Sequence, residues 1–355
     1  MKKVLVVGGG LSGVFFSIRL KELHPDYYVV IFEHNDKLLK KIYATGNGKC
    51  NFANKGDLEG KYSSSDFAFP ILKEFDYKDI IDYFHSIGVE SKSIGELIYP
   101  YSESAETVAN ALLKRVNELN IEVHLSEDVL DYKDHALFTN KGQFRYDYLV
   151  IASGGKAAPQ LGTDGKLLET LRKKNGVNEE IQPSLCPIVT KENTHSVEGL
   201  RHKCLVTLKS NNKELHKEEG EVLFKDDGLS GIVIYNISHY INIFGCYKSA
   251  EIHLDFAPSK NGEYESLVHP RLAKYLKSHN LDIHDTIFHF KKFYDYKNAQ
   301  VSGHVFDVNK LNKDLSLKDD KNLYFIGEAA GIFAACGGYN IMWALASADK
   351  AARSL

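Results

Sequence analysis

Cysteine, methionine and tryptophan are scarce in this 355-residue sequence, which has five, two and one of them. The cysteines stand far apart, without a CxxC pair or zinc-like spacing, so we expect neither disulfides nor a metal site. An excess of one charge sign is also lacking, because the net charge is −3 and the pI is about 6.6. The short basic runs 172–174 and 291–292 are interpreted as solvated helix ends, and no nucleic-acid partner is expected.

Long apolar runs are missing as well. The opening MKKVLVVGGG is apolar only briefly before its glycines, so it does not predict a signal peptide. Residues 329–348 carry no charge, but Gly337, Gly338 and Asn340 interrupt any single membrane-spanning helix. We therefore expect a cytoplasmic protein with no membrane partner. Its length and 43% hydrophobic content allow about two domains with buried cores.

The first strand-like segment leads into a glycine loop. Residues 4–7 form an apolar run typical of a buried parallel strand, and Gly8, Gly10 and Gly13 then match GxGxxG before a helical stretch. Such a loop lets a pyrophosphate approach the backbone at the N-terminus of the helix. A second apolar strand ends in Glu33, whose carboxylate suits adenosine ribose hydroxyls and disfavours a 2′-phosphate. The pattern predicts a dinucleotide site and leaves NAD and FAD open.

Two later segments favour FAD. An apolar strand leads into Gly154 and Gly155, and the strand at residues 323–326 leads into Gly327 and Glu328. In order and spacing they resemble the second and third signatures of flavoproteins of the two-dinucleotide-binding type. A carboxylate at Glu328 suits ribityl hydroxyls, and NAD has no ribityl chain.

Four blocks carry a resemblance to a known family: KKIYATGNGKCNFAN, GEVLFKDDGLSG, LYFIGE and CGGYNIMWALASA. Together they resemble the bacterial FAD flavoproteins that include aminoacetone oxidase, also described as NAD(P)/FAD-dependent oxidoreductases, over almost the whole chain. The resemblance implies an α/β fold, with a Rossmann-like FAD-binding domain of the two-dinucleotide-binding flavoprotein type. It also implies that an inserted β-barrel-like domain with a small helical part interrupts this domain. The sequence departs from the family pattern at Lys49, His304 and Cys336.

The expected domain boundaries follow from this resemblance. Residues 1–185 and 298–355 are assigned to a discontinuous FAD-binding domain, and residues 186–297 to an inserted substrate domain. Within the insert, residues 186–260 are rich in short alternating strands, whereas residues 261–297 are more helical and charged. The expected partner is a small-molecule substrate, and no oligomeric state is assigned.

The resemblance also implies which residues contact the cofactor. The segment after the second strand would fold back over FAD, with Lys41 or Lys49 offsetting phosphate charge, and the CGGYN block would aim a helix N-terminus at the flavin pyrimidine ring. Tyr339 and Asn340 are expected to contact the ring or its carbonyls, and Cys50 is interpreted as a packing residue. The full predicted set is Gly8, Gly10, Leu11, Ser12, Gly13, Glu33, His34, Lys41, Thr45, Gly46, Asn47, Gly48, Cys50, Asn51, Val129, Ser153, Gly154, Gly155, Gly327, Glu328, Gly338, Tyr339, Asn340 and Ile341.

The implied activity is that of an FAD-dependent oxidoreductase. A hydride would pass between flavin N5 and a small organic substrate, either in amine oxidation or in reduction with NAD(P)H as a transient reductant. Besides the flavin, the catalytic candidates are Tyr339, Asn340 and Cys336. Two alternatives stay open: a flavin-binding sensor or scaffold without turnover, and an NAD-dependent dehydrogenase with a single Rossmann site.

Overall fold

The computed structural model describes residues 2–163 and 165–355, and the chain divides into two compact units. Unit 1 comprises Met1–Ile181 and His304–Leu355, and unit 2 comprises Gln182–Gly303. Each unit has a hydrophobic core of its own. The insert predicted at 186–297 lies inside the range of unit 2.

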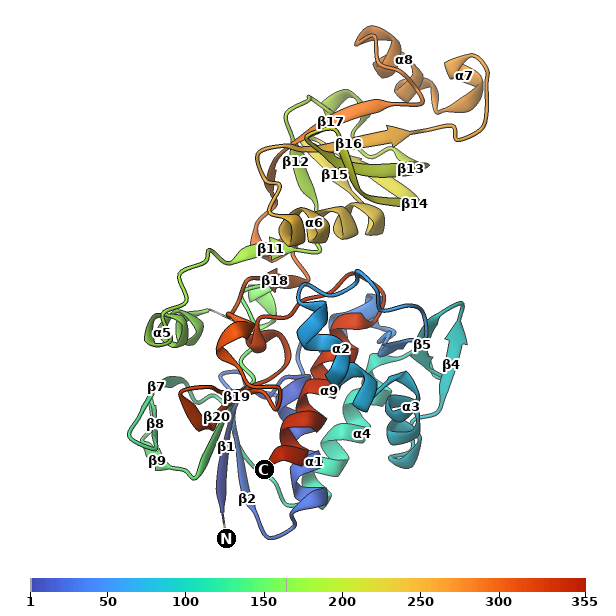
Figure 1. Cartoon of the computed structure of the whole chain (residues 1–355). Helices are drawn as coiled ribbons and strands as arrows, with labels where there is room; N and C mark the ends of the chain where they lie inside the picture. Colours follow the sequence, from blue (N-terminus) through green and yellow to red (C-terminus); the bar gives the residue numbers. More distant parts are fainter. Residues whose placement is uncertain (1, 164) are drawn as a thin grey trace. The chain divides into compact units, whose positions relative to one another are not determined.

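Unit 1 is organised around a six-stranded sheet with the order β19-β20-β10-β1-β2-β6 (Figure 1). All neighbouring strands from β20 to β6 pair in parallel, and β19 is antiparallel at the edge. The bounds are β1 Lys3–Val7, β2 Tyr28–Phe32, β6 Glu122–His124, β10 Tyr148–Ile151, β19 Ser316–Leu317 and β20 Asp320–Phe325. Because the parallel strands share one direction, the loops after β1, β2, β10 and β20 meet at one edge of the sheet.

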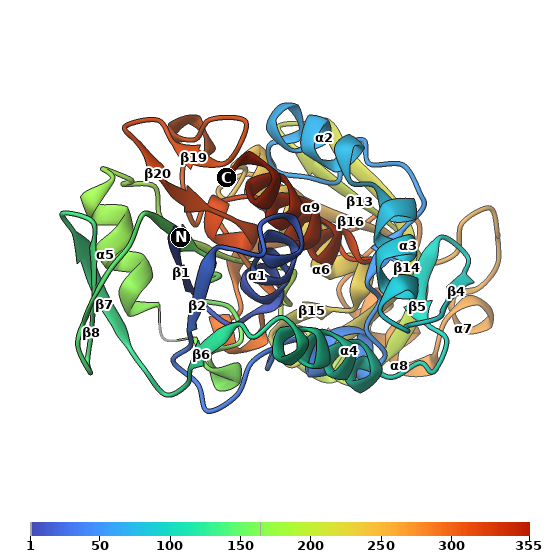
Figure 2. The same cartoon turned by 90° about the horizontal axis from the view of Figure 1, so that it is seen from below.

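Different layers cover the two faces of this sheet (Figures 1 and 2). On one face, α1 (Leu11–Leu23) packs against α9 (Tyr339–Ser354) and α4 (Ala105–Glu118). On the other lies a three-stranded antiparallel sheet, tied to β2 by the rings of Phe32 and Phe144, whose centroids are 4.8 Å apart. This sheet consists of β7 Val129–Lys133, β8 Ala136–Thr139 and β9 Gln143–Arg145.

The remaining elements of unit 1 surround this framework. The helices are α2 Ser65–Glu74, α3 Tyr77–Ser86 and α5 Lys166–Lys174, and a small sheet has β3 Ala53–Asn54, β4 Ser91–Ile94 and β5 Leu97–Pro100. The uncharged stretch near the C-terminus belongs to buried parts of unit 1, including α9. Across residues 2–163 and 165–355, no helix has both the length and the apolar character needed to cross a bilayer.

The basic run at 172–174 is not simply a solvated helix end, as the sequence suggested. Arg172 lies in α5 and is 7% exposed. Its guanidinium donates to the carbonyl oxygens of His304 and Val305, at 2.5 and 2.6 Å, and to that of Glu179. His304 Nδ1 in turn lies 2.9 Å from Glu179 Oε1. Arg172 therefore links the last part of unit 1 before residue 182 in the sequence to the part that resumes at His304.

Unit 2 contains a closed six-stranded barrel with the order β12-β15-β14-β13-β16-β17. Its strands are β12 Ile188–Thr190, β13 Arg201–Ser210, β14 Lys213–Lys225, β15 Gly228–Ser230, β16 Ala250–Asp255 and β17 Thr286–Phe293. Alternating positions fill the interior, where Phe224 and Phe288 are buried beside Ile252. Each barrel strand pairs with two neighbours, and β15 closes the barrel against the last three residues of β14, Leu223–Lys225.

Helices and a short sheet complete unit 2. Helix α6 (Ile232–Phe244) packs on β14, where a Cβ on Gly220 would lie 2.8 Å from Cβ of Val233. The other helices are α7 Tyr264–Leu267 and α8 Pro270–Ser278, and β11 Gln182–Ser184 pairs with β18 Val301–Gly303. Lys291 and Lys292 lie in strand β17, so interpreting them as a helix end was wrong.

Candidate functional site

In the glycine loop after β1, close backbone packing requires Gly8 and Gly13, whereas Gly10 faces open space. Gly8 has φ +108°, and a Cβ there would lie 2.5 Å from the Ala152 carbonyl oxygen. A Cβ on Gly13 would lie 2.0 Å from the Gly8 oxygen, so α1 packs directly on the loop. A Cβ on Gly10 would meet no described atom within 4 Å beyond its chain neighbours. Gly10 thus leaves its backbone accessible at the start of α1.

Glu33, at the end of β2, is held against this loop. Its Oε2 accepts from the Gly9 amide at 2.6 Å, and its Oε1 accepts from the Asn35 amide and Nδ2 at 2.8 and 2.6 Å. The residue is 9% exposed. A carboxylate has about four lone-pair sites, so capacity remains for a hydroxyl donor. This geometry suits the role predicted for Glu33 beside an adenosine ribose.

The second and third glycine segments lie beside the first. A Cβ on Gly327 would lie 2.6 Å from Ser12 Oγ in the first turn of α1, and a Cβ on Gly154 would lie 3.6 Å from Glu328 Oε2. Lys41 Nζ is 3.8 Å from the same Glu328 oxygen. Segments separated by more than a hundred residues therefore meet at the carboxyl edge of the parallel strands, where open α/β sheets bind ligands.

The polar segment that follows β2 adopts an unusual backbone. Within and just after η1 (Ile42–Gly48), positive φ angles occur at Gly46 (55°), Asn47 (54°), Gly48 (83°) and Cys50 (57°). The amides of Lys49 and Cys50 already donate to the carbonyl oxygens of Gly46 and Thr45, each at 3.1 Å, so the segment folds back on itself. Glycine and asparagine are the residues that most readily tolerate these left-handed conformations.

The structure separates the two lysines considered as phosphate counter-charges. Lys49 Nζ lies 2.5 Å from Glu103 Oε2, and its side chain is half exposed. Lys92 contacts the other oxygen of Glu103 at 2.6 Å. These two ammonium groups lower the pKa of Glu103 to about 2. Lys41, beside Glu328, is the lysine of the pair that lies at the converging segments.

Two buried oxygen atoms at this edge have no hydrogen-bond partner among the described residues: Asn51 Oδ1 and Ser153 Oγ. Leaving a buried polar atom unpaired costs about 1–3 kcal/mol. A Cβ on Gly338, at the N-cap of α9, would lie 3.0 Å from Asn51 Oδ1. Both atoms belong to predicted site residues, and a ligand with hydrogen-bonding groups would satisfy them.

The first turn of α9 differs in detail from the prediction. Asn340 Oδ1 accepts from the Ala334 amide at 2.9 Å, and its Nδ2 donates to the Ala334 oxygen at 2.8 Å. Tyr339 is 4% exposed, and its hydroxyl donates to the Asp57 oxygen at 3.2 Å. Both side chains thus form hydrogen bonds with the backbone of neighbouring loops. What α9 offers a ligand is the set of first-turn amides that have no intrahelical acceptor.

Trp343 in α9 has a role that the sequence alone does not reveal. Trp343 is 1% exposed, and its Nε1 donates to the Gly327 oxygen at 2.9 Å. The Gly327 amide donates to Ser347 Oγ at 2.9 Å. These contacts fix the turn that presents Glu328. A buried indole N–H needs a hydrogen-bond acceptor, so a buried Trp343 by itself predicts that its Nε1 donates to a nearby group.

The structure gives little support for a reactive cysteine among the predicted site residues. Cys50 is fully buried, and burial raises the pKa of its thiol to about 11. Such a thiol is almost entirely protonated near neutral pH and is a poor nucleophile. Cys336 is partly exposed and directly precedes the Gly337–Gly338 turn.

The other predicted residues lie in unit 1 as well. Leu11 and Ser12 form the first turn of α1. His34 Nδ1 pairs with Asp128, directly before Val129 at the start of β7, and the Glu127 amide donates to the Glu33 oxygen at 3.1 Å. The segment that contains Val129 is therefore held beside Glu33 by two contacts: the His34–Asp128 pair and the hydrogen bond from the Glu127 amide to the backbone carbonyl of Glu33.

Comparison with known proteins identifies the family. The family model described as "HI0933-like protein Rossmann domain" matches residues 2–354. The chain belongs to this family. It is an FAD-dependent oxidoreductase with a Rossmann-type FAD-binding domain. Asn51 Oδ1, Ser153 Oγ and the open space at Gly10 are observations that fit this cofactor.

Two curated relatives align with the chain over nearly their full length. The chain is 27% identical to the 3-dehydro-bile acid delta(4,6)-reductase of Clostridium scindens, covering 100% of this chain and 99% of that protein. It is 25% identical to the ribosomal RNA dihydrouridine synthase of Escherichia coli, covering 99% and 97%.

A solved structure supports the fold assignment. The 3-ketosteroid delta1-dehydrogenase of Sterolibacterium denitrificans aligns with a TM-score of 0.51 and 11% identity, covering 100% of this chain and 99% of that chain. This similarity concerns the fold alone.

Proposed function

We propose that this FAD-dependent oxidoreductase reduces a ring carbon–carbon double bond conjugated to a carbonyl group. The observation that carries the proposal is the full-length similarity to two curated relatives whose names describe one kind of chemistry. A delta(4,6)-reductase removes unsaturation from a ring system, and formation of dihydrouridine adds two hydrogen atoms to a uracil ring. Their substrates differ, so the shared element is hydrogen addition to a conjugated ring.

Bound FAD supplies hydride transfer at N5 for this reaction. The protein's part is to bind and orient. Glu33 would accept from the adenosine ribose, the start of α1 at Gly10 would hold the pyrophosphate, and Glu328 would accept from ribityl hydroxyls. The first-turn amides of α9 and its dipole would stabilise negative charge on the pyrimidine side of the flavin. The other predicted contacts, including His34, Val129 and the backbone of 45–51, are part of the same proposal.

The substrate domain is proposed to be the insert at 186–297, and NAD(P)H is proposed as the source of the hydride. A second candidate substrate is a pyrimidine in RNA, favoured by the similarity to the E. coli enzyme. The weak net charge of −3 does not favour extended contacts with nucleic acid, so the small-molecule substrate ranks first.

The direction of the reaction can be tested anaerobically on the FAD-loaded protein. NADH, NADPH and a panel of primary amines are each added while the visible absorbance of oxidised flavin is followed. We expect NADH or NADPH to bleach the flavin, and a steroid 4-en-3-one or uridine to restore its colour. Free FAD treated identically is the control. Bleaching by amines alone would point to amine oxidation, and a flavin that no reductant bleaches would indicate a sensor or scaffold.

A further inference from the structure

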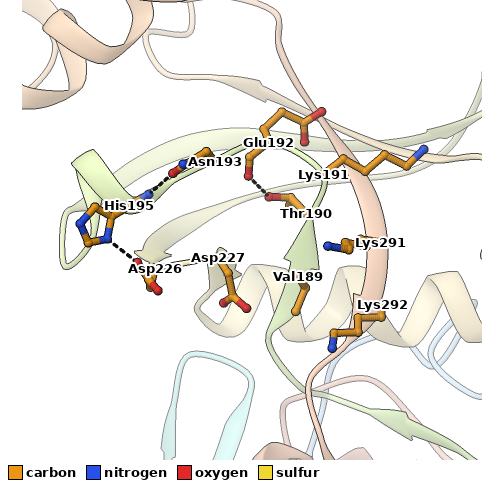
Figure 3. Close-up of a pocket in the computed structure, with 10 residues that line it drawn as sticks. All are labelled: Val189, Thr190, Lys191, Glu192, Asn193, His195, Asp226, Asp227, Lys291 and Lys292. Atoms are coloured by element: carbon orange, nitrogen blue, oxygen red, sulfur yellow. Dashed lines mark hydrogen bonds and ion pairs between the residues drawn. The ribbon is translucent and has the colours of Figure 1, made fainter.

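Unit 2 has a polar pocket that the FAD site does not involve. Its volume is about 470 Å³, within the range of about 300–1,000 Å³ usual for ligand sites. It is lined by β12, the segment after β12, the β14–β15 turn and β17 (Figure 3). The lining residues are Val189, Thr190, Lys191, Glu192, Asn193, His195, Asp226, Asp227, Lys291 and Lys292.

An irregularity in the barrel brings two adjacent lysines to this pocket. Val189 pairs with Lys292, but the next residue, Thr190, pairs with Phe290, so Lys291 is an extra residue on β17. Successive side chains of a regular strand point to opposite faces. A bulge re-aims a side chain, and such irregularities are frequent at barrel rims and functional sites. Lys291 and Lys292 consequently line the same cavity.

The three lysines of the pocket carry uncompensated charge. Lys191, Lys291 and Lys292 make no side-chain hydrogen bond or ion pair with any residue in 2–163 or 165–355. All three are exposed. Two neighbouring ammonium groups on one strand repel each other unless an anion lies between them, and phosphate is an anion that lysine commonly binds.

The acidic groups of the pocket are engaged elsewhere. Glu192 accepts from the His289 amide at 2.8 Å and lies 2.7 Å from His289 Nδ1. Asp226 pairs with His195, and this hydrogen bond raises the pKa of His195. Asp227 accepts from the Tyr294 hydroxyl. None of these three carboxylates forms an ion pair with Lys191, Lys291 or Lys292.

The two kinds of charge occupy different sides of the pocket. Figure 3 shows Lys291 and Lys292 on one side and Asp226 and Asp227 on the other. A ligand that is anionic throughout would be repelled by the aspartates. A ligand with a phosphate at one end and hydroxyl donors at the other would match both sides, since carboxylates retain lone pairs for such donors.

We propose that this pocket binds the phosphate and sugar hydroxyls of a ribonucleotide, with the lysines on the phosphate and the aspartates on the hydroxyls. The same chemistry is offered by a free mononucleotide and by a nucleotide within an RNA strand. The proposal concerns binding in unit 2 and does not depend on the redox reaction proposed for the protein.

The test is calorimetric titration of the FAD-loaded protein, because uridine 5′-monophosphate then has no vacant adenosine site to enter. The probes are uridine 5′-monophosphate, uridine, inorganic phosphate and a single-stranded oligouridylate. The Lys291→Gln/Lys292→Gln variant should bind the monophosphate about tenfold or more weakly, because it loses both charge-assisted contacts with the phosphate. The matched control is Lys203→Gln/Lys217→Gln, which removes the same charge from exposed barrel lysines that do not line the pocket.

The outcomes separate the sources of the ligand. Lysine-dependent binding of the monophosphate, with uridine much weaker, supports a free nucleotide; lysine-dependent binding of the oligomer alone supports an RNA strand. Inorganic phosphate binding as tightly as the monophosphate would overturn the role given to the hydroxyls. Equal binding by both double variants, or no binding of any phosphate probe, would overturn the site. The FAD content of every variant is measured as well. If it is unchanged, a loss of nucleotide binding cannot be attributed to a loss of the cofactor.

Discussion

The Gly10→Val variant is expected to fold normally and to be isolated without FAD. Gly10 has φ −73° and ψ −176°, an extended conformation that valine readily adopts. Its Cβ would meet no described atom of the protein within 4 Å. The added side chain would instead occupy the space at the start of α1 where the pyrophosphate is proposed to lie, so FAD affinity should fall by about a hundredfold or more.

Flavin absorbance relative to protein absorbance, followed by titration of the apoprotein with FAD, measures this effect. Gly142→Val is the matched control, because Gly142 lies in a turn where a Cβ would be 3.8 Å from the Phe144 ring, an ordinary contact. Gly13→Val should instead impair folding, since its Cβ would lie 2.0 Å from the Gly8 oxygen. Stoichiometric FAD in Gly10→Val would contradict the placement of the pyrophosphate.

Replacing Asn51 with leucine should change stability and cofactor affinity in opposite directions. Asn51 Oδ1 is buried without a partner among the described residues, so its removal relieves a cost of about 1–3 kcal/mol in the apoprotein. The same change deletes a group that FAD would satisfy, and the affinity should fall about tenfold or more. Urea unfolding of the apoprotein, followed by the fluorescence of the single tryptophan, Trp343 in unit 1, measures the first effect.

Asn54→Leu is the contrasting control. Asn54 Nδ2 donates to the Gly337 oxygen at 2.7 Å, and its Oδ1 accepts from the Gly56 amide at 2.8 Å, so this asparagine is already satisfied within the protein. Its replacement should destabilise the apoprotein. If Asn51→Leu behaves in the same way, Asn51 has a structural role and the proposed ligand contact is wrong.

The Rossmann-type unit was predictable because its signals are local. Gly8, Gly10, Gly13 and Glu33 lie within one strand–helix–strand unit, where a spacing of a few residues fixes which groups meet. The convergence of Gly154 and Glu328 on that unit was also predictable, because parallel strands bring their carboxyl ends to one edge. The FAD assignment followed from these segments, and the family match confirmed it.

The details that sequence reasoning missed depend on long-range partners. The CGGYN block does not reveal that the Tyr339 hydroxyl donates to the carbonyl oxygen of Asp57, which lies 282 residues earlier in the chain. Arg172 reads as one member of a basic run, yet its acceptors include carbonyls more than a hundred residues away. Likewise, no local pattern reveals that β17 has an extra residue opposite β12, which sets the direction of Lys291. Pairings of this kind are fixed by tertiary structure.

Hydrogen–deuterium exchange of the apoprotein with and without FAD tests the central claim, that segments far apart in the chain hold one cofactor. The account predicts slower exchange on FAD addition at residues 8–13, 45–51, 153–155, 327–328 and 338–341, because bound FAD would shield or bond their amides. Protection limited to 8–13, as a nucleotide bound to the first loop alone would produce, would contradict it.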